Sequence, residues 1–247
     1  MRMNGHDLTE TLPWLSGGTG YLLGAVDRLT DGELREPSAL SGWTRAHVVA
    51  HVARNAEALI RLASWARTGV ETPMYANSEQ RNADIEASAT LPADRLRAEL
   101  AGTAKDLAAA LHELDERAWH APLRSAQGRV IPATEVPWLR VREVWLHTVD
   151  LGAGARMDEL PAGVLDALLG DVTGTMSARE DCPSVVLEPA DREQTWRLGV
   201  VDATPVALRG TAAELTAWLV GRESGAGLSA HGPDGDEVEV SAAPRWL

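Results

Sequence analysis

The apolar residues of the first 155 positions recur every three or four residues in four long segments, which predicts four helices. Each would bury its apolar stripe against the others, as in an up-and-down four-helix bundle. The segments run from about Asp7 to Arg28, from Ser41 or Thr44 to Gly69, from Pro92 or Ala93 to Arg117, and from Glu135 to Leu151.

The stretches within and between these segments carry turn formers. The glycines of residues 17–20 lie inside the first segment and predict a kink or a loosened turn there. Residues 71–89 are polar, which predicts a long connection with about one helical turn. Gln127 and Gly128 predict the turn of a small hairpin before the fourth helix.

The pattern changes after residue 154. A helix is expected from about Pro161 to Ala178, and the β-branched, turn-bounded runs that follow predict short strands. We therefore expect a multi-domain fold, with an N-terminal four-helix bundle at residues 1–155 and a smaller C-terminal α+β domain at residues 156–247. The strands are expected within residues 184–190, 194–200, 205–210 and 238–240, and a further helix within residues 211–222.

Two of the bundle helices carry polar side chains on their apolar stripes. His51 lies at the centre of the second stripe, and Glu143 and His147 lie one turn apart on the fourth. The simpler interpretations are a core histidine and an ordinary helical hydrogen-bonded pair. If the two helices face each other, however, the three side chains form an N,N,O ligand set with an open position, which is typical of catalytic zinc.

Composition limits the classes of partner. The chain has 247 residues and a formal net charge of -13, which argues against nucleic acid or an anionic membrane as partner. The start of the chain has no secretory pattern, and no apolar stretch approaches the roughly 18 residues of a membrane span. A monomeric, cytoplasmic protein is expected. Cys182 is the only cysteine, so an internal disulfide is excluded.

Several segments together resemble one known family. These segments are GWTRAHVVAHVARNA (42–56), ETPMY (71–75) with a later RN, AQGRVIPATE (126–135), WLRVREVWLHTVDLGA (138–153), a late GR and the terminal PRWL. They closely resemble the mycothiol-dependent maleylpyruvate isomerases, DinB-like metal-binding bundles with an added C-terminal domain. The resemblance covers nearly the whole chain and is weakest in residues 156–205. It implies that His51, Glu143 and His147 bind zinc and that Arg222 is the functional arginine.

The resemblance also implies a reaction. Mycothiol is a low-molecular-weight cysteinyl thiol, and a zinc-bound thiol is deprotonated. Its addition to the cis double bond of maleylpyruvate would give an enediolate that can rotate, and its expulsion would leave trans fumarylpyruvate. The partners would then be a small anionic dicarboxylate and the thiol. Arg222 would bind carboxylate, although without the resemblance it would be interpreted as a cation at a helix C-terminus.

The remaining candidates have weaker signals. His47 matches no family ligand and is expected in the core or behind the ligands, and Cys182 before Pro183 is expected to be an incidental thiol. Arg81, Asn82, Gln127 and Arg129 match the family in connections, where contact with substrate or thiol and simple surface polarity explain them equally well.

Three functions are considered. The first is the isomerase, and the second is a mycothiol-dependent S-transferase or a metal-dependent hydrolase on the same zinc bundle, since one fold hosts many chemistries. The third is a non-catalytic metal-binding or regulatory module. Arg222 and the second domain argue against the third, because a metal-binding module would not need them.

Overall fold

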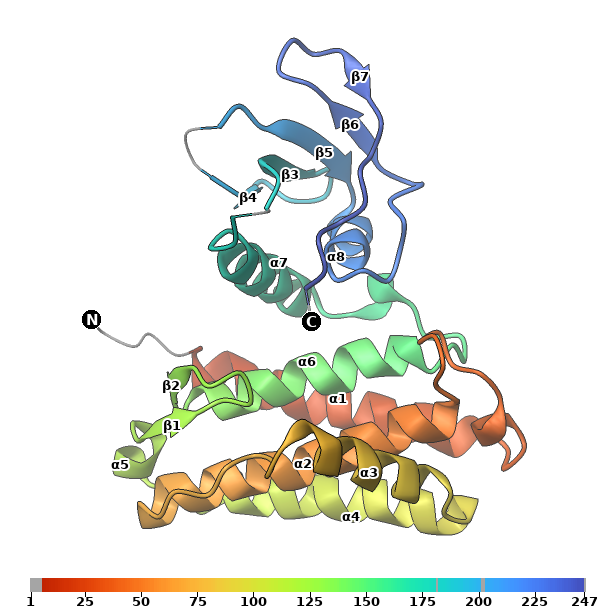
Figure 1. Ribbon diagram of the computed structural model, residues 1–247, viewed down its shortest axis with the longest axis vertical. Helices are drawn as coiled ribbons and strands as arrows, with labels where there is room; N and C mark the ends of the chain where they lie inside the picture. The colour runs from red at the N-terminus through yellow and green to blue at the C-terminus, as the bar shows by residue number, and fades with distance from the viewer. Residues whose placement is uncertain (1–5, 181, 201–202, 247) are drawn as a thin grey trace. The chain divides into compact units, whose positions relative to one another are not determined.

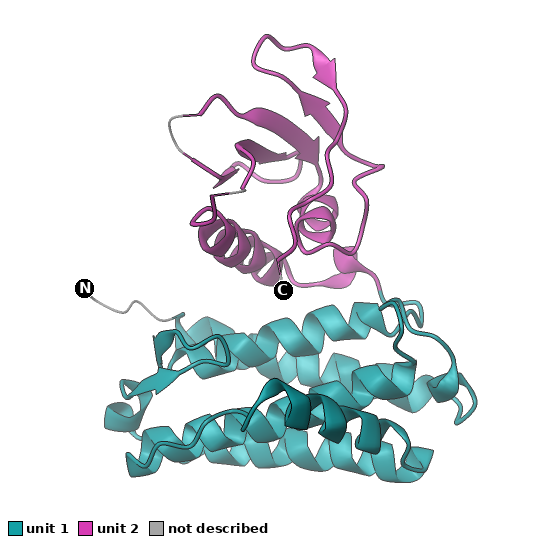
Figure 2. Ribbon diagram, viewed as in Figure 1, with its two compact units in different colours: residues 1–155 teal, residues 156–247 magenta. Residues whose placement is uncertain are grey.

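The computed structural model describes residues 6–180, 182–200 and 203–246. The chain divides into two compact units, residues 1–155 and residues 156–247 (Figure 2). The first unit is helical and the second contains a five-stranded sheet, so the expected fold class is confirmed.

Four long helices form the first unit, and each of the four was expected from the sequence (Figure 1). α2 packs against α4 and α6, and α1 packs mainly against α6. Leucine, valine and alanine side chains fill the space between them, with Leu59, Leu96 and Leu107 almost fully buried. The bounds are α1 Leu8–Arg28, α2 Arg45–Thr68, α4 Ala93–His112 and α6 Glu135–Asp150.

Local chemistry sets the ends of α2. Thr44 is the N-cap: its hydroxyl accepts from the His47 amide, and the His47 ring bonds back to the Thr44 amide. Gly69 ends the helix with a φ of 73°, a conformation that residues with a Cβ rarely adopt. Arg45 in the first turn donates to the carbonyls of Leu151 and Gly152, just beyond α6. This fixes the start of α2 against the end of α6.

Two expectations for this unit were wrong. The glycines do not interrupt α1, which is one continuous helix. A Cβ on Gly18 would lie 2.6 Å from Trp145 Nε1 and 2.6 Å from Val144 Cγ2, so this glycine serves close packing of α1 on α6. The expectation of a long polar connection at residues 71–89 with about one helical turn was also wrong in part. Ser78–Ala89 forms a helix of 12 residues, α3, which packs on α2. Asn77 caps it by accepting from the Gln80 amide.

The third expected helix is shorter than the apolar period suggested. α4 ends at His112, and the short helix α5, Glu116–Trp119, follows with Asp115 as its N-cap. Next comes the expected hairpin, β1 Pro122–Arg124 paired antiparallel with β2 Val130–Pro132. Gly128 in its turn has a φ of 79°.

The second unit begins with the 3₁₀ turn η2, Met157–Glu159, and contains one mixed sheet (Figure 1). The strand order is β4-β3-β5-β6-β7, with β3 parallel to β5 and the other neighbours antiparallel. Helices α7 and α8 contact each other and pack on the sheet. The bounds are α7 Ala162–Met176, β3 Val185–Pro189, β4 Trp196–Leu198, β5 Val206–Gly210, α8 Ala212–Leu219, β6 Ser229–His231 and β7 Glu237–Val238.

The expected helices and the first three expected strands of this unit are confirmed, whereas β6 was missed. Its sequence, SAH, is short and lacks the β-branched residues that mark a strand. β6 is a strand because β5 and β7 pair with it on either side.

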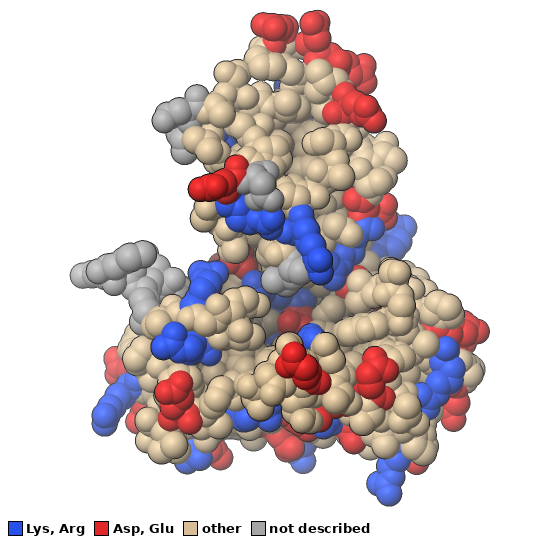
Figure 3. Space-filling model, viewed as in Figure 1, with Lys and Arg blue, Asp and Glu red and all other residues tan. Residues whose placement is uncertain are grey.

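Charge is unevenly arranged on the surface. In the view of Figure 3, acidic and basic side chains are interspersed over the first unit, and acidic side chains gather at the β6–β7 end of the second. Within the described residues, no helix has both the length and the apolar character needed to cross a membrane.

Candidate metal centre

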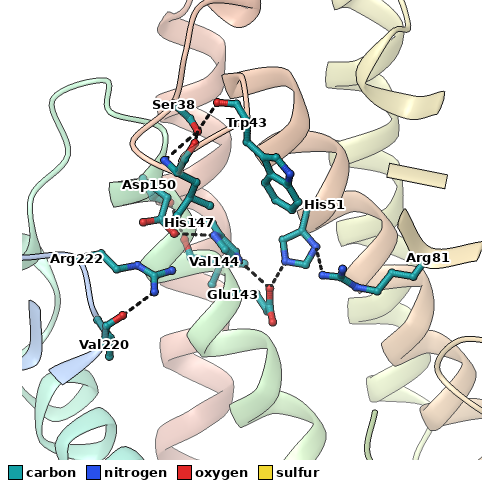
Figure 4. A network of polar contacts seen from close by, with 12 residues as sticks. Ser38, Trp43, His51, Arg81, Glu143, Val144, His147, Asp150, Val220 and Arg222 are labelled. Carbon is teal, nitrogen blue, oxygen red and sulfur yellow. Dashed lines mark hydrogen bonds and ion pairs between the residues drawn. The ribbon is translucent and has the colours of Figure 1, made fainter. Parts of the chain in front are cut away.

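His51, Glu143 and His147 converge in the first unit (Figure 4). Glu143 Oε2 lies 2.9 Å from His51 Nε2 and 3.1 Å from His147 Nε2. The two imidazole rings meet edge to face with their centroids 4.7 Å apart. Three potential ligand atoms from α2 and α6 therefore point toward one another, within 4.8 Å.

The helical repeat explains half of this arrangement. Glu143 and His147 are four residues apart on α6, so their side chains share one face. His51 is brought to them because α2 packs on α6 through fully buried apolar residues such as Val48 and Val144. The carboxylate is thus held between two rings by the packing of the bundle core.

Asp150 holds the second ring nitrogen of His147. Its Oδ2 lies 2.8 Å from His147 Nδ1, and its side chain is 0% exposed. The backbone carbonyl of Asp150 accepts from the Ala39 amide, which ties this end of α6 to the loop before α2. A carboxylate on Nδ1 fixes the orientation of the ring and leaves Nε2 directed at Glu143.

His51 has a different environment. The Trp43 ring lies against it with centroids 5.5 Å apart, and Arg81 Nη2 from α3 lies 3.2 Å from His51 Nδ1. Arg81 also lies over the Tyr75 ring and donates to Asn82 Oδ1. A guanidinium can only donate, so in this contact His51 Nδ1 is the acceptor. The positive charge of Arg81 therefore lies directly beside the cluster.

The three groups differ in protonation. Burial lowers the pKa of His51 more than Glu143 raises it, so this ring is neutral near pH 7. Burial opposes the charge on Glu143, but both imidazoles stabilise it and hold its pKa well below the usual range. Burial also opposes the charge on His147, yet its bonds to Asp150 and Glu143 raise its pKa to about 9.

These residues fit a divalent metal of the zinc type. Two imidazole nitrogens and one carboxylate oxygen make a preferred donor set, and ligand atoms about 2.0 Å from a tetrahedral zinc lie roughly 3.3 Å apart. The observed separations of 2.9 and 3.1 Å would need to widen by only a few tenths of an ångström. His147 would have to lose its proton, so the metal affinity of the cluster must depend on pH.

The structure places the other candidates as follows. His47 lies one turn before His51, but its Nδ1 bonds to Thr44 at 2.6 Å and its Nε2 faces Glu86 at 3.2 Å. It serves the start of α2 and does not join the cluster. Gln127 and Arg129 are exposed in the β1–β2 hairpin.

Arg222 and Cys182 belong to the second unit. Arg222 follows α8, and its Nη1 donates to the backbone carbonyl of Val220 at 2.8 Å. That is the contact expected of a cation at a helix C-terminus. Cys182 is half-buried, and as the single cysteine of the sequence it forms no internal disulfide. The role of Arg222 in a site shared with the bundle therefore stays a prediction.

Sequence reasoning missed three neighbours of the cluster. Asp150 lies three residues after His147, a spacing that by itself would have suggested a pair. Trp43 is in a loop, and Tyr75 is in the connection before α3, where helical periodicity gives no guidance. Burial, together with the negative charge of Glu143, raises the pKa of the Tyr75 hydroxyl, which keeps it neutral.

The fold and the cluster define a helical bundle with a candidate His-Glu-His metal centre, joined to a second, sheet-containing unit. Comparisons with known proteins identify this class more closely. Residues 15–152 match the mycothiol maleylpyruvate isomerase N-terminal domain, and residues 159–240 match the C-terminal domain of the same family. The chain therefore belongs to the mycothiol maleylpyruvate isomerase family, and the expected resemblance to an enzyme family is confirmed.

Comparison with solved structures supports the same family assignment. The chain is similar to a crystal structure of the mycothiol-dependent maleylpyruvate isomerase, with 35% identity over 98% of both chains and a TM-score of 0.89. A histidine-to-alanine mutant of that enzyme matches equally well. A third similar structure is YfiT from Bacillus subtilis, described as a probable metal-dependent hydrolase with an unusual four-helix bundle topology. The match covers 62% of this chain and 89% of YfiT, with 20% identity and a TM-score of 0.51. At this identity the similarity shows the fold alone. No curated protein sequence matches.

Proposed function

We propose that this protein converts maleylpyruvate to fumarylpyruvate by adding and then eliminating the thiolate of mycothiol, with Zn²⁺ held by His51, Glu143 and His147. The observation that carries the proposal is the convergence of these three side chains in a member of this family. A bound zinc would supply a thiolate at neutral pH by lowering the pKa of the thiol.

The protein side chains prepare the cluster for this role. His51 is neutral near pH 7 and Glu143 is anionic, which are the forms that bind metal. Asp150 fixes the ring of His147 and increases the basicity of its Nε2. The chain thus has the ligands and also the group that orients one of them.

A dicarboxylate substrate needs positive charge besides the metal. One carboxylate ligand and one thiolate cancel the formal charge of Zn²⁺, and the whole chain carries -13. Arg81 lies beside His51, and we include it with Arg222 as a group that binds substrate carboxylates. A neutral His51 that binds metal through Nε2 carries its proton on Nδ1, so it no longer accepts from Arg81. The guanidinium would then be free for an anion.

The test is an assay of the purified protein with maleylpyruvate in the presence and absence of mycothiol. Fumarylpyruvate should form only when the thiol is present, and the thiol should not be consumed. Stoichiometric consumption of the thiol would indicate an S-transferase on the same bundle, and absence of turnover with zinc-loaded protein would refute the proposal.

A second test concerns the nucleophile. Cys182→Ser should keep most activity, because the nucleophile is external. A folded but inactive variant would place the covalent chemistry on the protein.

A further inference from the structure

The connection between α2 and α3 is anchored to α2 just before Tyr75. Arg61 on α2 donates to the Met74 carbonyl from two nitrogens, Nε at 2.9 Å and Nη2 at 2.6 Å. The Met74 side chain is buried as well. Two donors from one planar guanidinium hold this carbonyl in both position and direction. The backbone that leads into Tyr75 is therefore fixed.

Tyr75 lies between this anchor and the metal cluster. Its side chain is half-buried, and burial together with the negative charge of Glu143 raises the pKa of its hydroxyl. The Glu143 carboxylate is therefore within electrostatic reach of Tyr75. The guanidinium carbon of Arg81 lies 5.7 Å from the centroid of the Tyr75 ring. At distances up to about 6 Å the face of an aromatic ring attracts a cation, so this ring helps to hold Arg81.

Arg81 has two further contacts. Its Nη1 donates to Asn82 Oδ1 at 3.1 Å, and its Nη2 lies 3.2 Å from His51 Nδ1 (Figure 4). Arg81 is the fourth residue of α3 and so lies near the helix N-terminus, where the helix dipole disfavours a cation. Side-chain contacts must therefore hold the guanidinium in place. Those with Tyr75 and Asn82 do not depend on His51.

A carboxylate can replace His51 as the acceptor. A His51 ring that binds metal through Nε2 and carries its proton on Nδ1 offers no acceptor to Arg81. A guanidinium binds a carboxylate through two parallel hydrogen bonds, and the Tyr75 ring and Asn82 would keep it in position meanwhile. An anion bound in this way would lie beside a metal ligand.

We propose that Tyr75 is a positioning residue, whose ring holds the Arg81 guanidinium beside His51 as the subsite for one carboxylate of the substrate. The substrate class rests on the proposed function, whereas the anchor and the ring contact do not. Because the ring face makes the contact, phenylalanine can replace Tyr75 and an aliphatic residue cannot.

The experiment is a calorimetric titration of the zinc-loaded, full-length protein with maleate, without thiol, so that no reaction occurs. Arg81→Met should bind maleate about ten- to a hundredfold more weakly, the factor expected for a charge-assisted hydrogen bond. Tyr75→Leu should lose roughly two- to thirtyfold, the range of a cation–ring contact, and Tyr75→Phe should keep the affinity. Tyr21→Leu, which removes a half-buried ring stacked on Trp145, is the matched control and should change nothing.

A double-mutant cycle separates positioning from a general structural effect. In the Arg81→Met background, Tyr75→Leu should have no further effect on maleate affinity, and the zinc content of every variant should be unchanged. Arg61→Met covers the case that Tyr75→Leu fails to fold, because it removes the anchor but keeps the ring. It should weaken maleate binding only when Arg81 is present.

Four outcomes would overturn the proposal. They are an equal loss in both backgrounds, a loss in Tyr75→Phe as large as in Tyr75→Leu, loss of zinc from Tyr75→Leu, and failure of the wild-type protein to bind maleate. Because binding is measured without turnover, the expected pattern in a protein that does not isomerise maleylpyruvate would refute the proposed function alone. Isomerisation with additive effects of the two substitutions would refute the subsite alone.

Discussion

His147 and Asp150 form a buried pair on the last turn of α6, with Nδ1 and Oδ2 2.8 Å apart and the Asp150 side chain fully buried. Because Nδ1 is occupied by this carboxylate, Nε2 is the nitrogen left to face Glu143. The pair therefore selects both the tautomer and the direction of one candidate ligand.

Replacing this carboxylate should weaken metal binding. Asp150→Ala should lower zinc affinity about 10- to 100-fold, and Asp150→Asn should lower it less, because its amide oxygen can still accept from Nδ1–H. Affinity can be measured by competition with a coloured chelator. Asp106→Asn, an exposed carboxylate-to-amide change on α4, is the control and should have no effect. Unchanged affinity in Asp150→Ala would show that the pair does not support a ligand.

Removing a ligand should remove the metal. Purified protein should contain close to one zinc per chain by elemental analysis, and His51→Ala or His147→Ala should lose it. His47→Ala is the matched control on the same helix, because that ring bonds to Thr44 and Glu86. It should keep the metal and lose about 1 kcal/mol of stability with the helix cap. Full metal content in both ligand variants would refute the assignment.

The metal-free protein should become less stable as pH rises from neutral. The pKa of His147 is about 9 in the folded state and about 6.5 when unfolded. Because the folded state binds the His147 proton more tightly than the unfolded state does, the protonated ring adds to the free energy of unfolding. This contribution is complete below about pH 6.5 and is lost as pH rises through about 9. Urea unfolding in chelator should show this fall in the free energy of unfolding. His147→Gln should lack the fall between pH 6.5 and 9, and an identical slope in both proteins would contradict the prediction.

Arg222 should matter for turnover but not for metal content. If it binds a substrate carboxylate, Arg222→Ala should lower kcat/KM about ten- to a hundredfold, corresponding to roughly 1.5 to 3 kcal/mol. Arg222→Lys should recover only part, because it keeps the charge but loses the planar fork. The control is Arg209→Ala in the same unit, whose guanidinium pairs with Glu188 at 2.7 Å. Normal kinetics in Arg222→Ala would leave it as a helix-terminal cation.

The close contact of α1 with α6 gives a test of the fold. Gly18→Ala should destabilise the protein by about 1 to 3 kcal/mol, because its Cβ would lie 2.6 Å from Trp145 Nε1. Gly20→Ala, where nothing lies within 4 Å of the added Cβ, should instead stabilise the helix by up to about 1 kcal/mol. Thermal unfolding of both variants distinguishes the signs. Equal stabilisation by both would show that the helices can separate.

The sequence predicted the helices in which the apolar periodicity is repeated over several turns. The long bundle helices, and also α7 and α8, were predicted from this periodicity. It failed for α3, a polar helix that buries only Ile85, Ser88 and Ala89, because so few buried positions leave no clear period. It also failed for β6, whose residues form a strand only by pairing with neighbours.

The same division applies to the candidate site. The sequence by itself determined that Glu143 and His147 share a face, because a spacing of four residues fixes their relative direction through the helical repeat alone. Only the tertiary structure decided that His51 Nε2 lies 2.9 Å from Glu143 and that Arg81 reaches His51. These contacts join separate elements, so they depend on how whole helices pack. Gly18 was misread for the same reason: a glycine has the same local effect in a kink and in a close helix contact, and only the partner helix distinguishes the two.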